Sequence, residues 1–254
     1  MSYELHDRLQ NVESAPAFDP SCNPRCSSDR AIHPIAKELL YTPHYRLADN
    51  LNLNEKQIKD ELSNLNGKWS GYNNDVKNVR GAGTSNYWSS KILRNWCDDP
   101  DFGFGETKDF LEVLGKKHLL ENGRVPPEHL VDTKLKLPYI RSIIERFVTW
   151  DMCDRIMVSK VDDSERINWH SHCYYEEIYT HAYLHIPLIT TKDTEMIVYM
   201  DGKHHFQHYA LNEAWIINTQ HNHAVNNKSG AVRYHALVMA NFEDPKFNAF
   251  FPRQ

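Results

Sequence analysis

Up to about residue 150, the hydrophobic residues recur at helical spacing. Helices are predicted over residues 53–66, over residues 107–121, and from Pro138 to about Thr149. Asn54 has a side chain that caps helices well, and proline suits the first position of a helix. The buried faces are expected to contain Ile58, Leu62 and Leu65 in the first helix, and Ile140, Ile143, Ile144 and Phe147 in the third. The regular part of this half is therefore predicted to be helical.

From about residue 154 the pattern changes to short runs rich in Ile, Val, Tyr and His, punctuated by Gly, Asp and Asn. Such runs are typical of antiparallel strands in a small barrel or sandwich. Strands are predicted over residues 155–161, 182–190, 195–200, 204–210, 214–218 and 232–242. Asp201 and Gly202 separate two of these runs and indicate a tight hairpin. Trp215 is expected to lie in the core of the barrel.

These patterns divide the chain into three parts. Residues 1–50 are proline-rich and have no sustained apolar period, so we predict an irregular N-terminal arm. Residues 51–150 form a helical and loop region that supports the barrel, with 68–106 read mainly as loops. Residues 151–254 form the β core. The expected fold class is α+β, one compact unit in which helices cover one face of the barrel.

Composition narrows the function only a little. The chain has 254 residues and a net charge of −5, which argues against a nucleic-acid-binding protein. It shows neither a secretory signal nor an apolar run long enough to span a membrane, so we expect a soluble, cytoplasmic protein without a membrane partner. Five scattered cysteines do not make a disulfide framework, and reduced thiols are expected.

Histidine is the unusual component. There are 15 histidines, most of them between His170 and His235. Imidazole binds Fe, Zn, Cu and Ni, although histidine is also an ordinary strand residue. Two ligands at positions i and i+2 of one strand, with a distant histidine, fill three corners of an octahedron and leave three for reactants. An arginine on the last strand would suit a carboxylate-bearing co-substrate.

Two segments carry residues at spacings that fit this chemistry. The C-terminal one contains His223, Val225, Asn227, Ser229 and Arg233, and the earlier one contains Ser159, Ile167 and His170. Two further runs lie between them, Leu184–Leu188 (Leu-His-Ile-Pro-Leu) and Asn212–Trp215 (Asn-Glu-Ala-Trp). Taken in order, these four matches resemble the aspartyl/asparaginyl β-hydroxylase-like family of Fe(II)/2-oxoglutarate oxygenases, which includes free-proline hydroxylases. The resemblance covers about residues 155–242.

The resemblance implies a fold, an activity and roles for individual residues. The fold would be a double-stranded β-helix, a cupin-like jelly-roll barrel, with the N-terminal helices packed against it. His170 and His223 would bind Fe(II), and Arg233 would pair with the distal carboxylate of 2-oxoglutarate. Ser159 and His185 match positions that help to hold this co-substrate. The activity would be hydroxylation of an unactivated C–H bond, with 2-oxoglutarate and O₂ converted to succinate and CO₂.

Two departures from the family leave alternatives open. His172 stands where one branch has Asp and another has Gly, so it is a third metal ligand, a group supporting a ligand, or a substrate contact. Tyr183 stands where the aspartyl branch has an arginine for its acidic substrate. His221 competes with His223 as the distal ligand, although the spacing to Arg233 favours His223.

The expected substrate is therefore a free amino acid, or an amino-acid side chain in a peptide. Two other functions fit the same barrel. One is a three-histidine dioxygenase that does not use 2-oxoglutarate, and the other is a non-catalytic, cupin-like binding protein.

Overall fold

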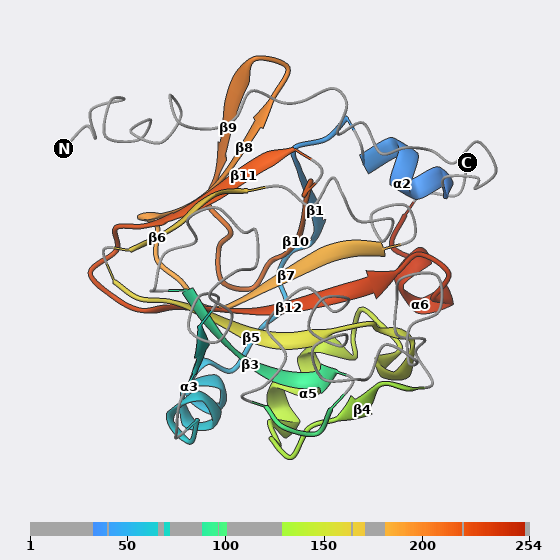
Figure 1. Cartoon of the computed structure of the whole chain (residues 1–254), viewed down its shortest axis with the longest axis vertical. Helices are drawn as coiled ribbons and strands as arrows, with labels where there is room; N and C mark the ends of the chain where they lie inside the picture. The colour runs from blue at the N-terminus through green and yellow to red at the C-terminus, as the bar shows by residue number, and fades with distance from the viewer. Residues whose placement is uncertain are drawn as a thin grey trace, which may run out of the picture.

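A computed structural model of the chain describes residues 33–39, 41–65, 69–71, 88–95, 97–100, 129–163, 165–170, 181–219 and 221–251. Most of the regular structure in these ranges is strand, arranged in two antiparallel sheets (Figure 1). The predicted helix over residues 107–121 lies outside the described residues.

The larger sheet has eight strands. Its order is β1 (His44–Ala48), β10 (Ala214–Ile217), β7 (His181–Ile189), β12 (Arg233–Asn241), β5 (Ile156–Val161), β3 (Trp88–Asn95) and β2 (Ser70–Gly71), with β4 (Val131–Asp132) also paired to β3. The long central strands β7 and β12 supply the middle of this sheet. Neighbours in the sheet are often distant in sequence, as expected when a chain winds back and forth between two sheets.

The smaller sheet has the order β6 (Arg166–His170), β11 (Asn222–Asn227), β8 (Thr194–Met200) and β9 (Lys203–Gln207). It lies over one face of the larger sheet (Figure 1). Strands β8 and β9 form the predicted hairpin, in which Asp201 and Gly202 have φ angles of 52° and 72°. Positive φ at both central residues is what a type I′ turn requires.

The two sheets enclose one hydrophobic cluster. Val161, Trp215 and Ile217 come from the larger sheet, and Ile167, Met196, Val198 and Val225 come from the smaller one. Side chains from facing sheets therefore meet in a single interior, with Trp215 in the core as predicted. Two facing antiparallel sheets with this strand order confirm the double-stranded β-helix.

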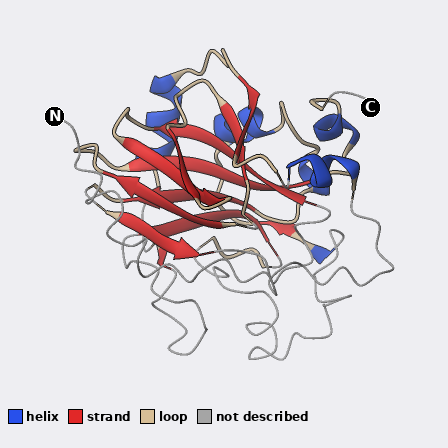
Figure 2. Cartoon of the chain, turned by 90° about the horizontal axis from the view of Figure 1, so that it is seen from above, coloured by secondary structure: helices blue, strands red, loops and turns tan. Residues whose placement is uncertain are grey.

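The helices pack on the opposite face of the larger sheet, which confirms the expected arrangement. The helices are α2 (Pro34–Leu39), α3 (Glu55–Ser63), α5 (Pro138–Ile144) and α6 (Pro245–Asn248), with the short 3₁₀ turn η4 (Trp150–Met152). Figure 2 shows the helices outside the strand layers. The second core contains Ile58, Leu62, Ile140, Ile143 and Ile144 from the helices, and Leu184, Ile186, Ala236 and Val238 from the sheet.

Local signals explain the two longer helices. The Asn54 side chain accepts a hydrogen bond from the backbone N–H of Gln57, so it caps α3 as predicted. Pro138 begins α5. The Glu61 carboxylate accepts the backbone N–H groups of Tyr139 and Ile140 at 2.6 and 2.9 Å, so one helix caps the other.

The first half of the chain contains more strand than the sequence predicted. The N-terminal segment, expected to be irregular, includes α2 and β1, and β1 pairs with β10 at the edge of the larger sheet. The segment read as loops includes the eight-residue strand β3, which pairs with β5. Both strands owe their conformation to partners far away in the sequence, which local patterns do not show.

Candidate active site

Arg233 begins strand β12 and lies inside the barrel with only 2% of its surface exposed. Its Nη2 donates to His235 Nδ1 at 2.6 Å and contacts Met196 Sδ at 3.3 Å, and its Nε is buried without a hydrogen-bond acceptor. None of the described residues places a carboxylate in ion-pair range of the guanidinium. Burial lowers the pKa of Arg233 from 12.5 to about 9. The barrel therefore holds an uncompensated positive charge that an anion would neutralise.

His235 lies beside this guanidinium, at the next position on the same face of β12. Its ring is fully buried, 6.3 Å from the ring of Tyr209 and 5.9 Å from that of His185. Burial and the positive charge of Arg233 lower the pKa of His235 well below its ordinary value, so the ring is neutral. Because a guanidinium can only donate, Nδ1 of His235 is the acceptor and its proton is on Nε2.

Serine residues extend this polar region across two neighbouring strands. The register of the larger sheet places Ser159 opposite both His235 and Ser90. Ser90 and Ser159 are 0% and 1% exposed, and Ser90 Oγ has no hydrogen-bond partner among the described residues. The result is a row of buried polar groups across β3, β5 and β12. Three apolar residues, Ile92, Met157 and Leu237, form the cluster on the next row of the same face.

Hydrogen bonds of His44 hold Tyr209, an aromatic residue that lines this region, in place. His44 Nε2 lies 2.9 Å from the backbone oxygen of His205, and His44 Nδ1 lies 2.9 Å from the Tyr209 hydroxyl. A carbonyl oxygen only accepts, so the His44 proton is on Nε2 and the hydroxyl of Tyr209 donates to Nδ1. Burial lowers the pKa of His44 to about 4, which keeps the ring neutral. Tyr209 in turn stacks on Trp215 at 4.9 Å.

Two of the predicted metal ligands, His170 and His223, lie on strands of the smaller sheet. His223 is 5% exposed, and its Nδ1 lies 3.0 Å from the backbone oxygen of His221. A ring N–H donated to a carbonyl puts the lone pair on Nε2, which is the usual arrangement in a metal-binding histidine. In the backbone register, His170 is the direct partner of His223. The His170 side chain and the whole of His172 lie outside the described residues.

Met196 links the predicted co-substrate residue Arg233 to the strand of the predicted metal ligand His223. Met196, which touches Arg233, is the cross-strand partner of Val225, two residues from His223. Two residues of strand span roughly 7 Å. Within the described ranges, no group of three side chains is arranged to hold a metal ion. The described side chains do not include that of His170, and no part of His172 is described.

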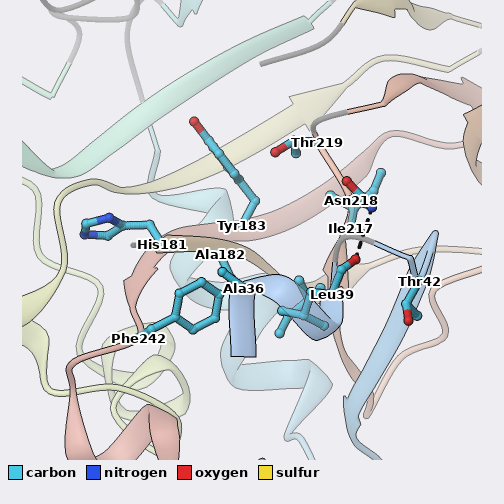
Figure 3. Close-up of a pocket in the computed structure, with 11 residues that line it drawn as sticks. Ala36, Leu39, Thr42, His181, Ala182, Tyr183, Ile217, Asn218, Thr219 and Phe242 are labelled. Carbon is cyan, nitrogen blue, oxygen red and sulfur yellow. Dashed lines mark hydrogen bonds between the residues drawn. The ribbon is translucent and has the colours of Figure 1, made fainter. Parts of the chain in front are cut away.

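A surface pocket lies at the ends of β7 and β10, next to α2 (Figure 3). Tyr183 and Thr219 line one side, and Ala36, Leu39 and Phe242 line the other. Strand β7 begins and strand β10 ends at this pocket. In the smaller sheet, β6 ends and β11 begins near the His170–His223 pair. Arg233, Ser159 and His223 do not line this pocket, so the buried charge, and not the visible hollow, defines the candidate site.

A family model agrees with this arrangement of residues. The model described as aspartyl/asparaginyl beta-hydroxylase matches residues 52–242, about three quarters of the chain. The chain belongs to this family. The family consists of Fe(II)/2-oxoglutarate oxygenases, and the match covers the segments of Ser159, His185, His223 and Arg233.

Solved structures of related oxygenases are similar only at a distance. A 2-oxoglutarate–Fe(II) oxygenase family oxidoreductase from Burkholderia pseudomallei is 11% identical, with 87% of this chain and 94% of that chain covered and a TM-score of 0.43. A prolyl hydroxylase from Trichoplax adhaerens, solved with a hypoxia-inducible-factor peptide fragment, is 13% identical, with coverages of 86% and 91% and a TM-score of 0.45. No curated protein matches the chain significantly. The assignment to the β-hydroxylase family therefore rests on the family model.

The candidate site of this β-hydroxylase family member includes residues that the sequence analysis did not select. The structure brings Arg233, Ser159 and His185 onto the inner face of one sheet, and places His223 on the facing sheet. His235 was detectable in principle, because it is two residues from Arg233 on a predicted strand. Ser90 and His44 were not detectable, because their strands were not predicted.

In the part of the chain that the structure describes, no helix has the length and apolar character needed to cross a bilayer.

Proposed function

We propose that the protein is an Fe(II)- and 2-oxoglutarate-dependent dioxygenase that hydroxylates an unactivated C–H bond. The carbon would belong to a free amino acid or to an amino-acid side chain in a peptide. The single observation that carries the proposal is Arg233, a fully buried arginine without a described carboxylate partner, facing the barrel interior. A buried charge of this kind costs several kcal/mol unless a counter-ion joins it.

The residues present fit 2-oxoglutarate and iron. Arg233 would hold the distal carboxylate, with Ser159 and His185 beside it on the same inner face. His223, whose hydrogen bond to a carbonyl leaves the lone pair on Nε2, would ligate Fe(II) together with His170. His172 remains a candidate third ligand. When bound, iron and 2-oxoglutarate supply the oxidation of the substrate by O₂, with succinate and CO₂ as the other products.

The surrounding residues would set the conditions for this chemistry. The apolar lining of the barrel excludes water, which strengthens the attraction between Arg233 and a carboxylate. Tyr209, fixed by its hydrogen bond to His44, has its ring nearly parallel to that of His235, with the ring centroids 6.3 Å apart.

Tyr183 bears on the class of substrate. Tyr183 stands where the aspartyl branch of the family has an arginine for an acidic substrate. Tyr183 lines the pocket at the ends of β7 and β10 (Figure 3). A phenol there offers one hydroxyl and an aromatic face in place of a positive charge. We therefore propose a substrate that is amino-acid-like but does not present a carboxylate to position 183.

Anaerobic titration tests the proposal directly. Fe(II)-loaded protein should develop a weak visible charge-transfer band when 2-oxoglutarate is added, and His223→Ala should lose this band. His129→Ala, at an exposed histidine, is the matched control and should keep it. Iron bound without the band would refute the 2-oxoglutarate proposal and favour a three-histidine dioxygenase. Failure to bind iron would favour a non-catalytic binding protein.

A further inference from the structure

The side chain of Asn227, at the end of strand β11, is fully buried and bonded to the backbone of two other segments. Its Nδ2 donates to the backbone oxygens of Val161 and Asp162, at the end of β5, at 3.0 and 2.9 Å. It also donates to the backbone oxygen of Ala231, in the turn before β12, at 2.9 Å. Because carbonyl oxygens only accept, the nitrogen of the amide must be the atom that faces them.

Two hydroxyl groups hold the amide in this orientation. Ser229 Oγ donates to Asn227 Oδ1 at 2.7 Å, and Thr194 Oγ1 donates to it at 3.2 Å. The backbone N–H of Ala231 in turn donates to Ser229 Oγ at 3.3 Å. Both polar atoms of the Asn227 side chain are therefore paired. Through them, the turn between β11 and β12 is bonded to the end of β5 and to the start of β8.

These bonds surround the backbone of Arg233. Val161, the last residue of β5, is the cross-strand partner of Arg233, the first residue of β12. Ala231 precedes Arg233 by two residues. The last pair of a strand ladder is the one that opens most easily, because it has a neighbouring pair on one side only. The Asn227 amide holds the carbonyls of both Val161 and Ala231, so it secures the pair in which Arg233 stands.

The same strand carries the proposed metal ligand. His223 and Asn227 are four residues apart on β11, so they share the inner face and lie about 13 Å from each other. Between them the pairing of β11 with β8 runs without interruption, from His223 opposite Val198 to Asn227 opposite Thr194. Strand β11 therefore connects the metal ligand to the amide that holds the start of β12.

We propose that Asn227 is a positioning residue, whose side-chain amide fixes the place of Arg233 relative to His223. The amide acts through the backbone and does not itself contact a ligand. Its effect on co-substrate binding rests on the proposed function, whereas its effect on the start of β12 does not. Without the amide, three buried carbonyls lose their donor and the first residues of β12 can separate from β5.

Hydrogen exchange of the full-length, ligand-free protein tests the positioning itself. In Asn227→Ala, the backbone amides of residues 233–237 should exchange about 10-fold faster, whereas those of residues 238–241 on the same strand should keep their rates. Asn54→Ala is the matched control, because it also removes an amide hydrogen bond, in α3, and should leave the contrast within β12 unchanged. Equal acceleration along the whole of β12 would indicate a general loss of stability and would overturn the proposal, as would unchanged rates.

Calorimetry on the Mn(II)-loaded protein tests the consequence for binding. The two probes are 2-oxoglutarate and 2-oxopentanoate, which has the same chain length but no distal carboxylate. Asn227→Ala should bind 2-oxoglutarate on the order of 10-fold more weakly and 2-oxopentanoate within roughly twofold of the unmodified protein. Asn54→Ala should bind both as the unmodified protein does. If Asn227→Ala weakens both probes equally, or neither, the amide does not act through Arg233.

A milder variant covers the case in which Asn227→Ala does not fold. Ser229→Ala keeps the amide and removes one of the two hydroxyls that orient it, so the same pattern is expected with a loss of roughly threefold for 2-oxoglutarate. Unchanged selectivity and unchanged exchange in this variant would then refute the role of the amide. If the unmodified protein does not bind 2-oxoglutarate, the proposed function fails, while the exchange measurement still decides the role of Asn227.

Discussion

Replacing Arg233 by methionine should make the ligand-free protein more stable and insensitive to 2-oxoglutarate. Burial lowers the pKa of Arg233 from 12.5 to about 9. At about 1.4 kcal/mol per pKa unit, this corresponds to a cost of about 5 kcal/mol for keeping the charge in the ligand-free barrel. Methionine fills similar space without the charge, so most of this cost would disappear.

Part of the gain is offset, because the substitution leaves Nδ1 of His235 without its donor. An unsatisfied buried acceptor costs about 1–3 kcal/mol. We therefore expect Arg233→Met to raise the free energy of unfolding by about 2 kcal/mol, within the range seen when buried ionic groups are replaced by apolar ones. For a chain of this size, that gain corresponds to an increase in melting temperature of roughly 4–8 °C.

The assay is thermal unfolding with Mn(II) present, with and without 2-oxoglutarate. At about 100 times its Kd, the co-substrate should stabilise the unmodified protein by about 2.7 kcal/mol and should not stabilise Arg233→Met. Arg141→Met is the matched control. Arg141 is bonded to Asp132 at 2.7 Å and Glu145 at 2.8 Å, so its loss should lower the melting temperature and leave the effect of 2-oxoglutarate intact. A destabilised Arg233→Met, or one that still responds to 2-oxoglutarate, would refute the reasoning.

Three further predictions concern stability, each checked by urea unfolding. Tyr209→Phe leaves the buried Nδ1 of His44 without its donor and should cost about 1–3 kcal/mol, so an unchanged midpoint would contradict the hydrogen bond. Asn54→Ala removes the cap of α3 and should cost about 1 kcal/mol, whereas Asn54→Asp should cost little. Because burial lowers the pKa of His44 to about 4, the unfolded state binds a proton first as the pH falls, and stability should decrease between pH 6.5 and pH 4, by up to about 3 kcal/mol. This dependence should flatten in His44→Asn, and an equally steep profile there would assign it to other groups.

Much of the fold was predictable where local pattern and final structure agree. The predicted strands over residues 155–161, 195–200 and 232–242 correspond to β5, β8 and β12, and the predicted hairpin at Asp201-Gly202 has the expected backbone. Helix α3 begins after the predicted cap. These elements combine an apolar period with a turn or cap residue, so the sequence alone specifies them.

Strand β3 shows why the rest could not be predicted. Its sequence, Trp-Ser-Ser-Lys-Ile-Leu-Arg-Asn, is largely polar, yet Lys91 and Arg94 are 3% and 5% exposed. Arg94 is accommodated by the backbone oxygens of Asp151 and Cys153 and by the Asp132 carboxylate, 3.6 Å away. Polar residues are tolerated inside only because partners from distant segments satisfy them, and no local pattern records those partners.

The candidate site divides in the same way. Arg233 and His223 could be selected because they stand at a fixed spacing within one continuous segment. His44 lies more than 150 residues from Tyr209 in sequence, and its hydrogen bond exists only because β1 pairs with β10. A spacing argument detects groups that share a strand or a hairpin, whereas groups assembled by strand pairing appear only in the folded chain.

The position of β1 limits how far the N-terminus can be truncated for expression. The family match begins at residue 52 and so omits His44–Ala48. A truncated protein that follows this boundary would turn β10 into an edge strand of the described sheet, with a row of unpaired backbone groups open to another molecule. It would also lose the imidazole that orients Tyr209. The smallest useful catalytic fragment therefore starts well before the family boundary, and a shorter one would be expected to aggregate during expression.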